Sequence, residues 1–253
     1  MKILSLASRY VRALLDLLLP RMCIVCGEKL LIDERHLCLE CLMNLPYTHF
    51  WERSHNPMAD KFNDVLQKEL EKVWEEELRQ ERYAYACALF FYNSDANFRL
   101  ITQELKYRRN IEAGRHFGRM LGKKLALGAH FGDVNMVIPV PLHWRRMWKR
   151  GYNQAEIIAA EVASALGAEL RTNALKRTRY TLTQTRMDVE SKAANVSGAF
   201  RASGLEGMTE GHVLIVDDVF TTGATLHACF EALRKVLPAT VRISVVTLGF
   251  VGR

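Results

Sequence analysis

The sequence predicts an α/β fold: a mostly parallel sheet with helices on both of its faces, preceded by a small cysteine-rich module. Two observations predict it. Short apolar runs alternate with segments of helical periodicity through the C-terminal half, and four of the six cysteines lie close together near the N-terminus. Such alternation is typical of strand–helix–strand units. With 253 residues, 49% of them hydrophobic and 25% charged, the composition excludes disorder or a disulfide-dense mini-protein as a description of the whole chain.

The first twenty residues resemble a secretory signal only superficially. Arg9, Arg12 and Asp16 interrupt the apolar run, which is therefore shorter than a secretory core needs. No stretch of the sequence approaches the ~18 apolar residues of a membrane span. Leu14, Leu15, Leu18 and Leu19 repeat at helical spacing, so we expect an amphipathic docking helix and a cytoplasmic protein.

Two cysteine pairs follow within residues 21–46. Each pair has the spacing C-x2-C, which turns both sulfurs of a short loop toward one point, and two such pairs hold one structural zinc ion. The predicted zinc ligands are Cys23, Cys26, Cys38 and Cys41. Disulfides or four unrelated thiols are the alternatives, and disulfides are rare without secretion. His36 lies nearby in sequence as a substitute ligand.

Three regions are predicted along the chain. Residues 1–58 contain the N-terminal helix and the zinc module, and residues 83–253 contain the α/β domain. Between them, residues 59–82 are charge-rich and lack both glycine and proline. Their apolar side chains follow a helical stripe, so this segment is predicted to be a connecting helix with a solvated face. The stripe consists of Phe62, Val65, Leu66, Leu70, Val73 and Trp74.

The elements of the α/β domain follow from apolar periodicity. Cys87 and Cys229 lie inside apolar elements and are predicted to be core residues, whereas residues 169–190 are predicted to be irregular and basic. Strands are predicted over residues 83–92, 134–140, 212–216 and 241–248, and helices over residues 96–109, 111–128, 152–166 and 224–237.

The clearest functional signal follows the strand Val213–Val216. Asp217 and Asp218 come directly after it, and a small hydroxyl-rich loop and a helix come next. Ligands of open α/β sheets bind at this carboxyl edge, and a helix N-terminus offers backbone N–H groups to anions. Carboxylates suit sugar hydroxyls and Mg²⁺, so the pattern indicates a phosphorylated sugar; ordinary capping is the structural alternative. The loop consists of Thr221, Thr222, Gly223, Ala224 and Thr225.

Other nucleotide-binding patterns are missing from the sequence. It has no G-x-x-x-x-G-K-[ST] and no G-x-G-x-x-G, which excludes a P-loop NTPase and a dinucleotide-binding fingerprint. The stretch Val213–Thr225 instead closely resembles the diphosphate-sugar motif of type I phosphoribosyltransferases. Together with further segments, it makes the chain similar to the ComF/GntX-type competence proteins from about residue 15 to 250. Those segments are the two cysteine pairs, Leu45-Pro46, Val137–Pro141, Arg150–Glu156, Gln184–Arg186 and Asn195–Phe200.

This resemblance implies roles for particular residues. Asp217 and Asp218 would contact the ribose hydroxyls of 5-phosphoribosyl 1-diphosphate, and Thr221–Thr225 would hold its 5-phosphate. The loop after Pro141 would lie at the diphosphate, which magnesium would neutralise. Residues of about 177–197 would form the mobile loop that closes over the site. The family is associated with DNA uptake in natural transformation and, in some bacteria, with gluconate use.

The basic segments leave several interpretations open. Arg145, Arg146, Lys149 and Arg150 are interleaved with Trp144 and Trp148. They could hold a diphosphate, bind single-stranded DNA by stacking, or be a solvated helix start with core tryptophans. Arg177, Arg179 and Arg186 lie either on a cationic lid or on a plain exposed loop. The predicted substrate-binding arginines are Arg145, Arg150 and Arg186.

The formal net charge of +7 is concentrated in one part of the chain. From Pro141 to Arg186 there are nine Lys and Arg against three acids, so this stretch carries nearly the whole surplus. A small phosphorylated sugar is therefore favoured over a diffuse nucleic-acid coat. Two hypotheses follow: a magnesium-dependent phosphoribosyltransferase of unknown acceptor, or an inactive adaptor or sensor. The adaptor would dock a helicase-like partner through the zinc module or bind single-stranded DNA.

Overall fold

The computed structural model describes residues 19–70, 82–92, 97–178 and 198–252. Within these residues the main feature is a five-stranded parallel sheet with the order β1-β7-β6-β2-β3. Its strands are β1 (Ala86–Phe91), β2 (Met136–Pro139), β3 (Glu169–Leu170), β6 (Gly211–Phe220) and β7 (Val241–Phe250). A separate antiparallel pair consists of β4 (Leu175–Arg177) and β5 (Phe200–Ala202). The predicted α/β fold with a parallel sheet is confirmed.

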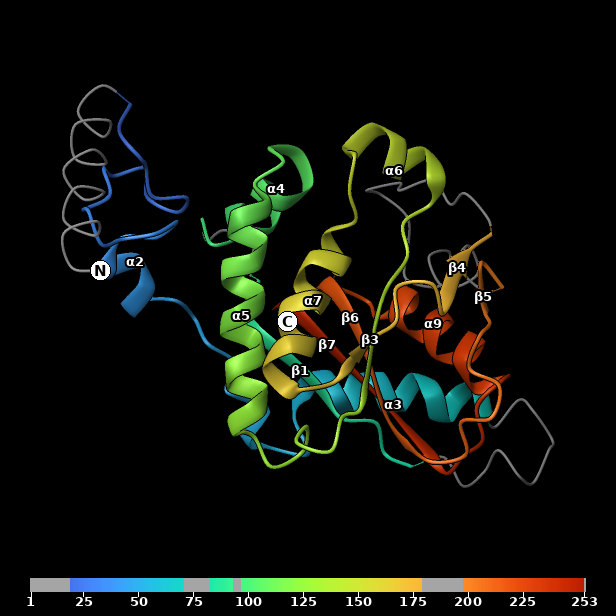
Figure 1. The fold of residues 1–253 in the computed structure, drawn as a ribbon. Helices are drawn as coiled ribbons and strands as arrows, with labels where there is room; N and C mark the ends of the chain where they lie inside the picture. The colour runs from blue at the N-terminus through green and yellow to red at the C-terminus, as the bar shows by residue number, and fades with distance from the viewer. Residues whose placement is uncertain (1–18, 71–81, 93–96, 179–197, 253) are drawn as a thin grey trace, which may run out of the picture.

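Helices cover both faces of this sheet (Figure 1). On one face α5 and α7 pack against each other and α7 packs on β2 and β6, while α3 and α9 pack on β1 and β6 from the other face. No helix among the described residues is long and apolar enough to cross a membrane. The helices are α2 (Leu39–Met43), α3 (Pro57–Leu70), α4 (Arg99–Tyr107), α5 (Ile111–Leu127), α6 (Trp144–Arg150), α7 (Gln154–Leu166) and α9 (Ala224–Arg234), with a 3₁₀ turn, η1, at Phe50–Glu52.

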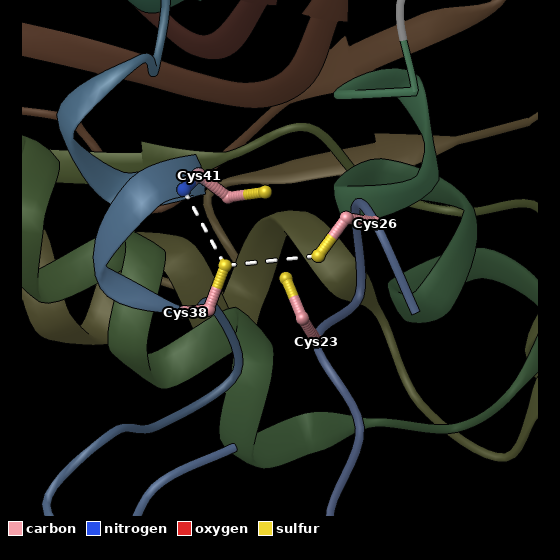
Figure 2. A group of neighbouring side chains, drawn as sticks. All are labelled: Cys23, Cys26, Cys38 and Cys41. Atoms are coloured by element: carbon pink, nitrogen blue, oxygen red, sulfur yellow. Dashed lines mark hydrogen bonds between the residues drawn. The ribbon is translucent and has the colours of Figure 1, made fainter. Parts of the chain in front are cut away.

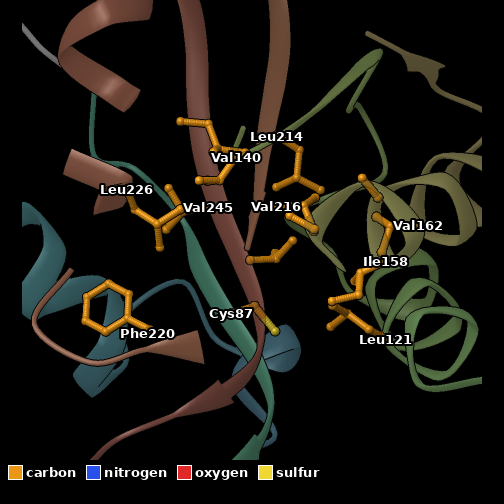
Figure 3. Close-up of a cluster of buried hydrophobic side chains, with 14 of the residues drawn as sticks. Cys87, Leu121, Val140, Ile158, Val162, Leu214, Val216, Phe220, Leu226 and Val245 are labelled. Carbon is orange, nitrogen blue, oxygen red and sulfur yellow. The ribbon is translucent and has the colours of Figure 1, made fainter. Parts of the chain in front are cut away.

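The core lies between the sheet and these helices. Figure 3 shows Leu121, Ile158 and Val162 on the α5 and α7 side, and Leu226 on the α9 side. All four are at most 1% exposed, and full burial of such a side chain contributes about 1.5–3 kcal/mol. A side chain at Gly122 of α5 would place its Cβ 2.7 Å from that of Ala165. Glycine therefore allows α5 and α7 to pack closely.

The central strand is longer than predicted. It continues past Val216 to Phe220, because β7 pairs with it up to the register Phe220↔Phe250. On its other side β2 ends at Pro139, opposite Val216. The irregular region predicted over residues 169–190 contains the short strands β3 and β4 within its described part. Isolated pairings this short carry little apolar periodicity, which explains why the sequence does not reveal them.

The N-terminal elements pack closely against the sheet domain. Phe62 of α3 is fully buried and lies against His227 of α9, with 4.7 Å between ring centroids. Tyr47 forms an isolated β-bridge with Phe90 of β1. The boundaries at residues 58 and 82 stay a prediction, and residues 71–81 of the predicted connecting helix lie outside the described residues. Cys87 and Cys229 are fully buried, as predicted.

Candidate functional site

The two acidic residues lie where the central strand β6 continues beyond the end of its neighbour β2. Asp217 and Asp218 follow Val216, the last residue that pairs with β2, so this side of β6 is open beyond that point. Asp217 is partly exposed and its Oδ1 accepts a hydrogen bond from the backbone N–H of Asp218 (2.8 Å). Burial, followed by the charge of Asp218, raises the pKa of Asp217 to about 7. These two residues, the acid pair, place two carboxylates at the open end of β6.

Two cations from distant elements flank the acid pair. Lys106, in the last turn of α4, places its Nζ 2.8 Å from Oδ2 of Asp218, and the two side chains are 26% and 12% exposed. Burial acts to lower the pKa of Lys106, but Asp218 and Asp217 raise it above its ordinary value overall. Burial and then the charge of Arg146 lower the pKa of Arg177, on β4, while Asp217 acts in the opposite direction. Asp218 thus has a cationic partner that the protein itself supplies.

The threonine loop connects β6 to α9 through a left-handed turn. Gly223 has φ +82°, and a Cβ there would lie 2.7 Å from the ring of Phe220. Thr222, Ala224 and Thr225 are partly exposed, and the backbone N–H of Ala224 lies 3.4 Å from Oγ1 of Thr222. Close beside the acid pair, the loop and the start of α9 present the N–H and hydroxyl groups that suit a phosphate.

A third element, Lys61 of α3, contacts this loop from the opposite face. Its Nζ donates a hydrogen bond to the carbonyl oxygen of Thr221 (2.9 Å) and lies 5.7 Å from the centroid of the Phe220 ring. Thr221 itself is exposed. The lysine therefore joins the loop to a helix that precedes it by 160 residues.

The basic segment after β2 forms the short helix α6, which lies with α4 at the upper end of the molecule in Figure 1. Its tryptophans are exposed, Trp144 by 62% and Trp148 by 89%, so the alternative of core tryptophans is wrong. Arg150 lies 5.8 Å from the centroid of the Tyr107 ring at the end of α4. Arg145 stacks on Trp144 with its guanidinium carbon 5.2 Å from the ring centroid. The predicted Arg186 lies outside the described residues.

The segment Arg150–Glu156 connects α6, α4 and the sheet. Gly151 ends α6 with φ +82°, and the side chain of Asn153 caps α7 by accepting from the N–H of Ala155 (3.1 Å). The Nδ2 of Asn153 also donates to the carbonyl of Val140 (3.0 Å) just after β2. The hydroxyl of Tyr152 donates a hydrogen bond to the carbonyl of Leu105, one residue before Lys106. This segment therefore fixes the turn of α4 that carries the lysine.

The four predicted zinc ligands come together in the N-terminal module (Figure 2). Their sulfurs all lie within 4.8 Å of one another, and the sulfurs of Cys26 and Cys38 are 3.6 Å apart. This is too long for a disulfide, whose S–S bond is ~2.05 Å. It is close to the ~3.8 Å edge of a tetrahedron with zinc–sulfur bonds of ~2.3 Å. The donor set therefore fits a structural zinc ion.

Local backbone geometry shapes this cluster. Gly27 turns with φ +75°, and its N–H donates to the carbonyl of Cys23 (3.0 Å). Burial acts to raise the pKa of Cys23, but hydrogen bonds from the backbone of Cys26, Cys38 and Val25 lower it to about 7, whereas burial raises the pKa of Cys41 far above its ordinary value. His36 is not part of the cluster; its ring lies 5.3 Å from that of His116 on α5.

Comparisons with known proteins agree with this geometry. Residues 152–249 match the model of the phosphoribosyl transferase domain. The DNA utilization protein YhgH of Escherichia coli O157:H7 is 30% identical over 226 residues, 88% of each chain. The chain belongs to the ComF/GntX-type family. Competence protein F of Haemophilus influenzae is 26% identical over 220 residues, 84% of this chain and 90% of that protein. For a Salmonella typhimurium protein named DNA utilization protein YhgH, the match at 31% identity covers 57% of this chain and 64% of that protein.

Sequence reasoning missed Lys106, Lys61 and the role of Tyr152. Lys106 ends a helix in a run of basic residues, where a solvated lysine is the ordinary expectation. Nothing local distinguishes it from Arg108 or Arg109. The contact with Asp218 depends on how α4 packs against the sheet, and only Tyr152, inside a segment that resembles the family, gave a signal that this region matters.

Proposed function

We propose that this ComF-type protein binds 5-phosphoribosyl 1-diphosphate with Mg²⁺ at the carboxyl edge of its sheet, and that it serves DNA utilization in competence. The carrying observation is the continuous unit of β6, the threonine loop and α9, which places the acid pair beside a phosphate-type loop. The match to the phosphoribosyl transferase domain covers this unit. The names of the relatives support the link to DNA.

Each part of the site has a role in this proposal. The acid pair accepts hydrogen bonds from the ribose hydroxyls, and the threonine loop with the N-terminus of α9 holds the 5-phosphate. Arg145 and Arg150 on α6, together with Arg177, supply positive charge on the diphosphate side. Transfer breaks the bond between the anomeric carbon and the diphosphate, so positioning and charge stabilisation are the main contributions of the chain.

The carboxylates of the acid pair also fit Mg²⁺. This ion takes oxygen ligands, commonly one or two carboxylates together with substrate phosphates and water. Asp218 is engaged by Lys106, so Asp217 is the member of the acid pair that would ligate the ion. When bound, Mg²⁺ would neutralise charge on the diphosphate. In the N-terminal module we propose a structural zinc ion held by the four cysteines, because four sulfur ligands leave no position for substrate.

The test is a calorimetric titration of 5-phosphoribosyl 1-diphosphate with Mg²⁺ into the zinc-loaded protein. We expect saturable binding that is lost in the double variant Asp217→Asn, Asp218→Asn. The matched control is Glu206→Gln, which removes an exposed acid from the loop before β6, away from the carboxyl edge. Equal binding by wild type and the double variant, or no binding by wild type, would contradict the proposal.

A second measurement separates an enzyme from an adaptor. Diphosphate release is assayed with a panel of nucleobases and other amine acceptors. Release that the double aspartate variant loses supports a phosphoribosyltransferase. Saturable binding without release supports the adaptor or sensor, whose helicase-like partner stays a prediction. In that case, Cys38→Ser should abolish transformation while the double aspartate variant retains it.

A specific observation favours a second candidate function, binding of single-stranded DNA. Tyr107, Trp144 and Trp148 are 74%, 62% and 89% exposed, and arginine side chains lie against two of these rings. Exposed aromatics interleaved with cations are the usual platform for unpaired bases, and each stacked base contributes about 1–3 kcal/mol. Arg150 lies against Tyr107, which follows Lys106 on α4, so part of this surface adjoins the acid pair.

The DNA hypothesis is tested by fluorescence anisotropy with an oligothymidylate. The double variant Trp144→Ala, Trp148→Ala should weaken binding at least tenfold, since two stacking contacts are lost. Leu127→Ala is the control, because Leu127 is 82% exposed on α5. Affinity should also fall steeply with salt. An unchanged affinity in the double variant would remove this candidate.

A further inference from the structure

Lys106 was not among the site residues predicted from the sequence, yet it forms an ion pair with Asp218 of the acid pair. Its Nζ lies 2.8 Å from Oδ2 of Asp218, and both side chains are mostly buried. Lysine is almost never enclosed in this way unless it is paired. A lysine ammonium is positively charged at neutral pH. A fixed cation therefore lies against the carboxylate that the proposed function assigns to the sugar.

Three contacts fix the end of α4 that carries Lys106. Tyr152 donates its hydroxyl proton to the carbonyl of Leu105. Asn110 caps the next helix by accepting from the N–H of Ala113 (3.1 Å), and Arg108 pairs with Glu104 (3.0 Å) across the last turn of α4. A cation in the last turn is also favoured by the helix dipole. The ammonium is thus positioned by the fold.

We propose that Lys106 is an internal counter-ion of the acid pair. Its ammonium positions the carboxylate of Asp218 and competes with divalent cations for that carboxylate. With this ammonium against Asp218, the site carries too little negative charge to hold a free divalent cation tightly. The divalent cation therefore binds well only together with an anionic ligand whose own oxygens complete its coordination. This proposal concerns the same site and rests on the proposed function for the identity of that ligand.

The experiment measures Mn²⁺ binding to the zinc-loaded protein by electron paramagnetic resonance, in the absence of any phosphorylated sugar. Lys106→Met keeps the apolar stem and removes the charge, so Mn²⁺ should bind about tenfold more tightly. Lys106→Arg should bind like wild type. The matched control Lys123→Met removes an exposed cation of α5 and should also leave the affinity unchanged.

A milder variant, Tyr152→Phe, keeps the test decisive if Lys106→Met folds poorly, and a double variant locates the effect. Tyr152→Phe removes only the hydrogen bond that fixes the turn, so Mn²⁺ affinity should rise by a smaller factor. In the double variant Lys106→Met, Asp218→Asn the gain should disappear, which locates the effect at the pair. Mn²⁺ affinity in Lys106→Met that equals or falls below that of wild type would overturn the proposal.

The outcome is independent of the proposed function. If 5-phosphoribosyl 1-diphosphate does not bind to wild type, the proposed function fails, but the Mn²⁺ series still reads the effect of Lys106 on the acid pair. If the sugar binds with Mg²⁺ and the Mn²⁺ series shows no gain in Lys106→Met, the proposed function stands and the counter-ion role fails.

Discussion

The cysteine cluster and the acid-pair site are assembled in opposite ways. The contacting sulfurs of Cys26 and Cys38 are only twelve positions apart in the chain, whereas Lys61 reaches across 160 positions to hold the threonine loop. The first site is formed by turns, and turn geometry is encoded locally. The second is formed by helix packing on a parallel sheet. The difference explains why the sequence reveals all four cysteines of the first site but not Lys61 or Lys106 of the second. It also predicts how substitutions affect each site.

The largest effect is expected for the cysteine cluster, the site that is formed locally. Cys38→Ser should reduce bound zinc from about one ion per chain to a trace, since a missing thiolate breaks the tetrahedral set. Structural zinc sites contribute on the order of 10 kcal/mol of binding energy, so residues 21–46 should become sensitive to proteases. Atomic absorption and limited proteolysis measure both.

Cys87→Ala is the matched control for this loss. It also removes one cysteine, but from the core of β1, where the thiol is fully buried and burial raises its pKa far above the ordinary value. Zinc content should not change. Equal zinc loss in both variants would show that zinc binding requires an intact sheet. The cysteine cluster would then not be a locally formed site.

The next effect tests the assembled site. Asp218→Asn leaves Lys106 charged and mostly enclosed without its ionic partner, which should lower the free energy of unfolding by about 2–3 kcal/mol. Chemical denaturation measures it. Glu112→Gln breaks the exposed pair with Arg115, whose side chains are 70% and 53% exposed, and should cost less than about 0.5 kcal/mol. Similar losses of unfolding free energy in the two variants would show that the pair of Asp218 with Lys106 contributes no more than an exposed ion pair.

The raised pKa of Asp217 gives the assembled site a pH signature. In the unfolded chain this carboxyl titrates near pH 4, but in the folded protein near pH 7. Between these values the folded state binds the additional proton, so this group makes the free energy of unfolding fall as pH rises from about 4 to about 7. Several histidines act in the opposite direction because burial lowers their pKa.

The difference between wild type and Asp217→Asn isolates this contribution. The variant should gain stability relative to wild type as pH rises through the window, and the gap should level off above pH 7. Denaturation at several pH values measures it. A constant gap across the window would mean that Asp217 titrates normally and that the strand end is more solvated than the structure indicates.

Much of the fold and part of the site could be predicted from these residues. Val213–Val216 revealed a buried strand because four apolar residues precede two acids, and Asn110 stands directly before the predicted helix over residues 111–128, where a cap is expected. The extension of β6 to Phe220 could not be predicted, because it depends on pairing with the distant β7. The exposure of Trp144 and Trp148 was equally hidden, since an aromatic side chain has the same sequence signal on a surface as in a core.

The smallest effect concerns the lysine that joins α3 to the threonine loop. Lys61→Gln removes an ammonium from the carbonyl of Thr221, and because this contact is exposed, stability should change by less than about 0.5 kcal/mol. The loop should nevertheless be less restrained, so affinity for the 5-phosphate should fall by about two- to fivefold, the size of one weak hydrogen bond. Calorimetric titration with ribose 5-phosphate measures this.

Lys68→Gln, further along α3, is the control. If neither variant weakens binding, the loop is positioned by β6 and Gly223 alone, and the assembled site depends on fewer distant contacts than its geometry indicates.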